Sequence, residues 1–170
     1  MTNSKNSKNN KKFPIALLGM AVALAMVLSY FESMIPPAAG IPGVKIGLAN
    51  IVTMVILLEL RTEYAVLVAM VRVTLSSLLF GSIAMIPYGM AGAIASILIL
   101  VCLKRNEKIS LIGKSMCGGV IHNVAQLVVA SAFLENITVF FYTPILILSG
   151  AIMGMLTGTV ARIVTKAIRN

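Results

Sequence analysis

The chain has 170 residues, of which 59% are hydrophobic and 11% charged, with a mean hydropathy of +0.99. A soluble domain is about half apolar and about a quarter charged, so this composition excludes an ordinary soluble protein and indicates an integral membrane protein. At about 20 residues per crossing, the length allows about six helices with short loops.

The net charge of +9 could suggest a nucleic-acid partner, but the distribution of the basic residues argues against one. All of them except Lys45 and Arg72 fall in the N-terminal tail, around two short loops or at the C-terminus. This pattern follows the positive-inside rule, so we predict that both termini are cytoplasmic. We expect the protein in the cytoplasmic membrane of a bacterium, with lipid around it and no nucleic acid bound.

The N-terminal residues 1–12 are almost entirely Asn, Ser and Lys and are predicted to be a disordered tail. Residues 13–170 are predicted to form a single transmembrane domain. Its first helix is expected at 13–34, and its small residues are typical of a face that packs closely against another helix in lipid. These residues are Gly19, Ala21, Ala23 and Ala25. The partner helix could belong to this chain or to another.

An irregular segment separates the first two helices. Between residues 31 and 50 the chain has three prolines and three glycines, together with Glu32, Lys45 and Asn50. Proline fixes φ and glycine permits positive φ, so this segment is predicted to be bent. It could form the wall of a substrate site, or it could be a tight turn without a ligand role.

Five further helices are predicted, at residues 44–60, 62–81, 85–103, 111–133 and 140–168. Arg72 lies about 15 Å along the third helix, which is near the middle of the membrane. Burying arginine there costs at least about 2.5 kcal/mol, so it should face the interior and be paired. The sixth helix carries a close-packing repeat, formed by Gly150, Gly154 and Gly158.

The polar side chains inside the predicted helices all lie from the midplane outward. They are Glu32, Lys45, Asn50, Arg72, Ser76, His122, Asn123 and Gln126. Because isolated polar groups are costly in lipid, we predict one polar cavity that opens to the outside and binds substrate. Its basic side chains would suit a carboxylate or phosphate on a small organic molecule.

Structural explanations remain open for the same residues. Arg72 and Glu32 could form an ion pair that serves only the fold. The polar side chains of the fifth helix could simply bond neighbouring helices. Cys102 and Cys117 both lie toward predicted cytoplasmic ends, so we expect no disulfide, and we expect neither a metal nor a cofactor.

Four motifs resemble the Gx transporter family, whose members often carry the label heptaprenyl diphosphate synthase component I. They are Met34-Ile-Pro36, Pro42-Gly-Val-Lys45-Ile-Gly-Leu-Ala-Asn50, Arg72-x-x-x-Ser76 and His122-Asn-x-x-Gln126. The resemblance spans nearly the whole chain after the tail. The chain departs from the family pattern at Ala125, where Gly is usual, and at the turn 88–92.

That family is similar to the substrate-binding S components of energy-coupling-factor transporters. The resemblance implies a six-helix bundle with an outward-facing ligand site beneath the first outer loop. It also implies docking to an energy-coupling membrane subunit, with its ATPases, through the small-residue face of the first helix. We therefore expect a component that takes up a small anionic organic molecule.

A different class of function follows from the family label, namely a membrane subunit in prenyl-quinone synthesis or in quinone- or flavin-linked redox metabolism. Prenyl synthases hold Mg²⁺ and diphosphate with aspartate-rich motifs, because hard cations need carboxylate oxygens. This chain has no Asp, only five scattered Glu and no P-loop, so we expect no catalysis from it alone. It could still be the partner of a prenyl synthase. A third alternative is a structural protein without a ligand.

Overall fold

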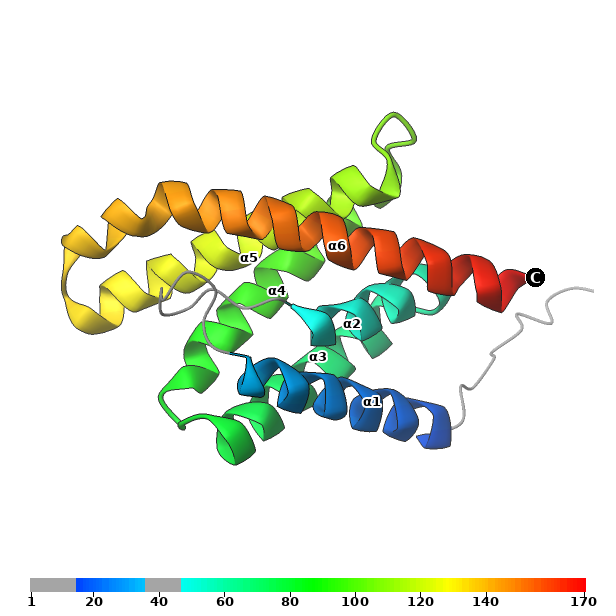
Figure 1. Cartoon of the computed structure of the whole chain (residues 1–170), viewed down its shortest axis with the longest axis horizontal. Coiled ribbons are helices and arrows are strands. Elements are labelled where there is room, and N and C mark those ends of the chain that lie inside the picture. The colour runs from blue at the N-terminus through cyan, green and yellow to red at the C-terminus, as the bar shows by residue number, and fades with distance from the viewer. Residues whose placement is uncertain (1–14, 36–46) are drawn as a thin grey trace, which may run out of the picture.

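Apolar stretches form helices throughout residues 15–35 and 47–170, the part of the chain that the computed structural model describes. The helices are α1 (Ile15–Met34), α2 (Leu48–Glu59), α3 (Thr62–Phe80), α4 (Met85–Lys104), α5 (Leu111–Leu134) and α6 (Thr143–Arg169), as Figure 1 shows. These bounds agree with the predicted ones to within four residues. The sixth helix begins later than expected because a short 3-10 helix, η2 (Ile137–Tyr142), precedes it.

The surface of the bundle is apolar, as contact with lipid requires. α1, α3, α4, α5 and the combined η2–α6 unit are each long and apolar enough to cross a membrane. Large side chains such as Leu79 and Ile163 are more than half exposed on these helices. Since water would disfavour such a surface, the protein is a multi-pass membrane protein.

The second helix is shorter than a membrane is thick. α2 has 12 residues, which corresponds to about 18 Å at 1.5 Å per residue. The hydrocarbon core of a bilayer is about 30 Å thick. Of the residues expected to extend this helix, Gly47 is not helical and 44–46 lie outside the described part of the chain. The described residues contain five helices long and apolar enough to cross a membrane.

Five of the helices form a closed ring. α2 packs against α3, α3 against α4, α4 against α5, α5 against α6, and α6 returns to α2. Across the ring, no Cα atom of α2 lies within 8 Å of α4 or α5 in the described structure. α1 stands outside the ring and packs against α2 and α3 (Figure 1). Across the middle of the ring, α2 therefore meets α4 and α5 only through side chains.

The closest helix pair is α5 with α6. Gly150, Gly154 and Gly158 of α6 lie directly against the backbone or Cβ atoms of α5. A Cβ atom added to Gly154 would lie 2.5 Å from the carbonyl oxygen of Ser115, which leaves no room for any side chain. This glycine repeat therefore packs within the chain, through close approach of two backbones.

The small residues of α1 divide between two faces. Ala25 is fully buried and Ala21 partly buried, and both pack in the core that α1 shares with α2 and α3. Gly19 and Ala23 are exposed, and Gly19 has no neighbouring atom within 4 Å of a built Cβ. The pair that faces away from the bundle is thus Gly19 and Ala23, whereas Ala21 and Ala25 are used inside the chain.

Candidate functional site

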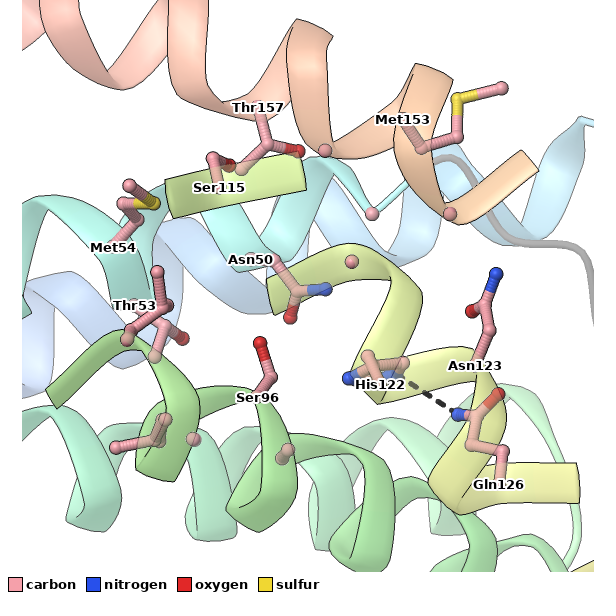
Figure 2. Close-up of a pocket in the computed structure, with 18 residues that line it drawn as sticks. Asn50, Thr53, Met54, Ser96, Ser115, His122, Asn123, Gln126, Met153 and Thr157 are labelled. Atoms are coloured by element: carbon pink, nitrogen blue, oxygen red, sulfur yellow. Dashed lines mark hydrogen bonds between the residues drawn. The ribbon is translucent and has the colours of Figure 1, made fainter. Parts of the chain in front are cut away.

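A cavity lined by both polar and apolar residues occupies the interior of the ring, and all five ring helices line it. Its polar lining side chains are Asn50, Thr53, Ser96, Ser115, His122, Asn123, Gln126 and Thr157. Figure 2 shows Asn50, Ser96 and His122 pointing into this space from α2, α4 and α5. The cavity volume is about 60 Å³. This exceeds the roughly 10–15 Å³ that one water needs, so the space can hold ordered water, and a larger ligand requires the ring to widen.

Asn50 is oriented by Arg72. The guanidinium Nη2 of Arg72 donates to Asn50 Oδ1 at 2.9 Å, and Arg72 is 8% exposed. Because the amide oxygen is occupied, Asn50 is left with its NH₂ group as a donor. A Cβ built on Gly47 would lie 3.4 Å from Asn50 Nδ2 and 3.8 Å from Thr157 Oγ1, so this NH₂ lies on the cavity wall between α2 and α6.

Glu32 holds the start of α2. Its Oε1 accepts a hydrogen bond from the backbone N–H of Gly47 at 2.7 Å. Gly47 has φ of 77°, a left-handed conformation that glycine adopts without strain, and it precedes the first turn of α2. The Gly47 carbonyl in turn accepts from Asn50 N–H at 2.9 Å. Glu32, Asn50 and Arg72 are therefore parts of one hydrogen-bonded chain.

Glu32 and Arg72 do not pair directly. Within the described residues, the ion pairs are Arg61–Glu63 at 3.7 Å and Arg169–Glu59 at 2.8 Å. Glu32 nevertheless attracts Arg72 electrostatically. Arg72 Nε is buried and has no hydrogen-bond partner among the described residues. The buried cation is thus stabilised by Asn50 and by a carboxylate at longer range.

His122 and Gln126 form a bonded pair one turn apart on α5. Their Nε2 atoms are 3.0 Å apart, the contact drawn as a dashed line in Figure 2. An amide nitrogen can only donate, so in this arrangement Gln126 donates and His122 Nε2 accepts. Gln126 Oε1 then remains as an acceptor.

Asn123 bonds the neighbouring helix. Its Nδ2 donates to the carbonyl oxygen of Leu146 at 2.9 Å and to Ser149 Oγ at 3.3 Å. The side chain lines the cavity but its donors are used on α6. Bonding between helices, one of the two explanations considered for the polar residues of α5, therefore describes Asn123 well.

Of the eight predicted substrate residues, the structure brings four to the cavity wall, namely Asn50, His122, Asn123 and Gln126. Arg72 and Glu32 lie behind that wall, and Ser76 bonds the carbonyl of Val73 in its own helix at 3.2 Å. Lys45 lies outside the described residues. None of the described lining residues is Lys, Arg, Asp or Glu, and the positive charge of Arg72 lies behind Asn50.

Sequence reasoning missed four hydroxyl residues that line the cavity, namely Thr53, Ser96, Ser115 and Thr157. They extend the polar surface to the middle and inner part of the bundle, which was expected to be apolar. Serine and threonine can bond their own helix backbone, so single hydroxyls in apolar helices carry little signal. The one signal in the sequence that could have identified these hydroxyl residues is that several of them lie at a similar depth in the membrane.

Comparison with known proteins addresses the family. Neither the curated proteins nor the solved structures include a match to this chain. The sequence model of one family, described as heptaprenyl diphosphate synthase component I, matches residues 21–164. That range contains α2 to α5, most of α1 and α6, and the whole cavity. The chain therefore belongs to the heptaprenyl diphosphate synthase component I family.

Proposed function

We propose that the protein is the membrane-embedded substrate-binding component of a transporter, of the energy-coupling-factor type. In this proposal it takes up a small anionic organic molecule, and an ATP-dependent partner supplies the energy. The observation that carries it is the group of eight polar side chains that line the cavity at the centre of an apolar helix ring. Polar groups at membrane depth are costly, and those that face a shared cavity usually serve a ligand pathway.

The chemistry of the wall supports an anionic ligand. Asn50 offers an NH₂ group to the cavity, and the charge of Arg72 lies directly behind it. A carboxylate or phosphate oxygen could accept from that amide and be attracted by the cation at one remove. The hydroxyl groups of Ser96 and Thr157 could donate to further oxygens of the same ligand.

We further propose six crossings in an S-component-like bundle in the bacterial cytoplasmic membrane, with both termini cytoplasmic. The beginning of α1 and the end of α6 lie at the same end of the bundle (Figure 1). The basic residues of the described loops and helix ends gather at that end, as the positive-inside rule requires of a cytoplasmic face. They are Arg61, Lys104, Arg105, Lys108, Lys114, Arg162, Lys166 and Arg169.

The family description favours a second function, in which the chain is a membrane subunit of prenyl-quinone synthesis beside a catalytic synthase. Catalysis by this chain alone is disfavoured by its composition, since it has no Asp for an aspartate-rich diphosphate site. In both proposals the chain itself is not the enzyme.

Native mass spectrometry of the protein purified gently from its own membrane separates the two functions. The wild type is compared with Asn50→Ala, which removes the cavity amide, and with Asn106→Ala, a matched change in the exposed α4–α5 loop. A small acid that co-purifies with the wild type and Asn106→Ala, but not with Asn50→Ala, supports transport. An empty cavity with a co-purifying prenyl synthase would reject it in favour of the subunit.

A further inference from the structure

The interior of the ring continues beyond the central cavity toward the basic end, defined as the end where Lys104, Lys114 and Arg169 lie. A second cavity, also about 60 Å³, occupies this region between α2, α4 and α5. Its lining residues are Met54, Leu57, Leu58, Leu100, Lys104, Leu111 and Lys114. Met54 and Leu100 line both cavities, so these two side chains separate them.

This separation consists of side chains rather than backbone. No Cα atom of α2 lies within 8 Å of α4 or α5, the helices on the opposite side of the second cavity. Methionine is unbranched and has three rotatable bonds, so Met54 can change rotamer without moving its helix. A constriction of this kind can open at a lower cost than one made by packed backbones.

Two lysines stand at the outer limit of the second cavity. Lys104 Nζ donates to the carbonyl of Leu57 near the end of α2 at 3.1 Å, and Lys114 Nζ donates to the carbonyl of Lys104 at 3.3 Å. Each bond satisfies the end of a helix, and each ammonium retains two further donors. Neither lysine forms an ion pair with an acid in the described structure. The mouth of the cavity is therefore positively charged.

We propose that these two cavities form one route for a small anion, with Met54 and Leu100 as its gate and Lys104 and Lys114 at its exit. The inference rests on the proposed function in that it specifies where the bound molecule leaves the ring. The lysines would raise the local concentration of anions at the exit, as charged rims do in clefts with low-dielectric walls. The same lysines would disfavour small cations.

Cysteine labelling in lipid nanodiscs tests the route. The full chain carries Ser96→Cys, which places a thiol in the central cavity one turn from Leu100, in a background of Cys102→Ala and Cys117→Ala. The probes are sulfonatoethyl methanethiosulfonate, an anion, and trimethylammonioethyl methanethiosulfonate, a cation. We expect the anion to react faster, and Lys104→Gln with Lys114→Gln to reduce this preference about three- to tenfold.

The gate is tested by changing its size. Leu100→Ala should accelerate labelling by both probes because it widens the constriction, and Met54→Phe should slow both by about tenfold or more because the larger ring narrows it. Leu98→Ala and Met70→Phe are matched controls, since both side chains face lipid on α4 and α3. They should leave the rates unchanged.

Labelling that is equal in the gate variants and their controls would overturn the route, as would an anion preference that survives loss of both lysines. The outcome is independent of the ligand, because the probes replace it. A failed search for a co-purifying molecule would thus count against the proposed function and not against the route. Labelling rates that do not change in the gate or lysine variants would count against the route and not against binding in the central cavity.

Discussion

Replacing Gly154 with alanine tests the closest contact in the ring. The added Cβ would lie 2.5 Å from the carbonyl oxygen of Ser115 and 2.7 Å from Cα of Met116. Both atoms are backbone, so no side-chain rotation can relieve the clash. Ordinary van der Waals contact begins at 3.4 Å, so α6 would have to withdraw from α5 by about 1 Å. Overpacking of this kind costs about 1–3 kcal/mol of stability.

The matched control is Gly19→Ala on the lipid-facing side of α1. A Cβ at Gly19 has nothing within 4 Å, so the change adds no clash. Alanine also stabilises a helix interior by about 0.5–1 kcal/mol relative to glycine. The same substitution is therefore expected to have opposite signs at the two positions.

The assay is reversible unfolding in mixed micelles, in which SDS is titrated and helix content is followed by circular dichroism. Gly154→Ala should unfold at a lower SDS fraction than the wild type, and Gly19→Ala at an equal or higher one. If Gly154→Ala were as stable as Gly19→Ala, then α5 and α6 would not meet through this face. The ring would then not be closed as described.

Three further predictions concern side-chain hydrogen bonds. Asn123→Ala removes the side-chain hydrogen bonds to α6 and should lower the free energy of unfolding by about 0.5–2 kcal/mol in the same SDS titration. An unchanged stability would mean that these bonds do not hold α5 against α6. Ser110→Ala removes the N-cap of α5 and should cost about 1 kcal/mol, measured likewise, with Ser82→Ala in the α3–α4 turn as the control. Arg72→Met should shift the side-chain NH₂ signal of Asn50 in NMR spectra of protein with isotope-labelled asparagine, and an unmoved signal would contradict their bond.

Much of the helical structure could be predicted without coordinates. Long apolar stretches bounded by turn residues define α3, α4 and α5 almost to the residue, because in lipid every backbone N–H and C=O must be satisfied within the helix. The start of α6 was less predictable. Thr143 follows a 3-10 turn whose apolar side chains look like the helix itself, and Pro144 is compatible with the first turn of either element.

The candidate site was only partly predictable. His122, Asn123 and Gln126 stand out because amides and imidazole are rare in apolar helices, and the structure places all three at the cavity. The depth of each residue in the membrane could be estimated by counting along its helix. The rotation of each helix about its own axis could not be predicted. Ser76 and Arg72 were therefore both predicted to face the cavity. In the structure Ser76 donates to the backbone of its own helix, and Arg72 lies behind Asn50.

The sequence by itself determined that this is a helical membrane protein and where its helices run, because hydropathy and helix length are local properties. Tertiary structure alone decided that five helices close into a ring, that Ala21 and Ala25 pack inward while Gly19 and Ala23 face out, and that hydroxyl groups from four helices meet in one cavity. These features depend on which helices are neighbours and how each is rotated. Apolar side chains of similar size satisfy many such arrangements equally well, so their pattern along the chain does not choose among them.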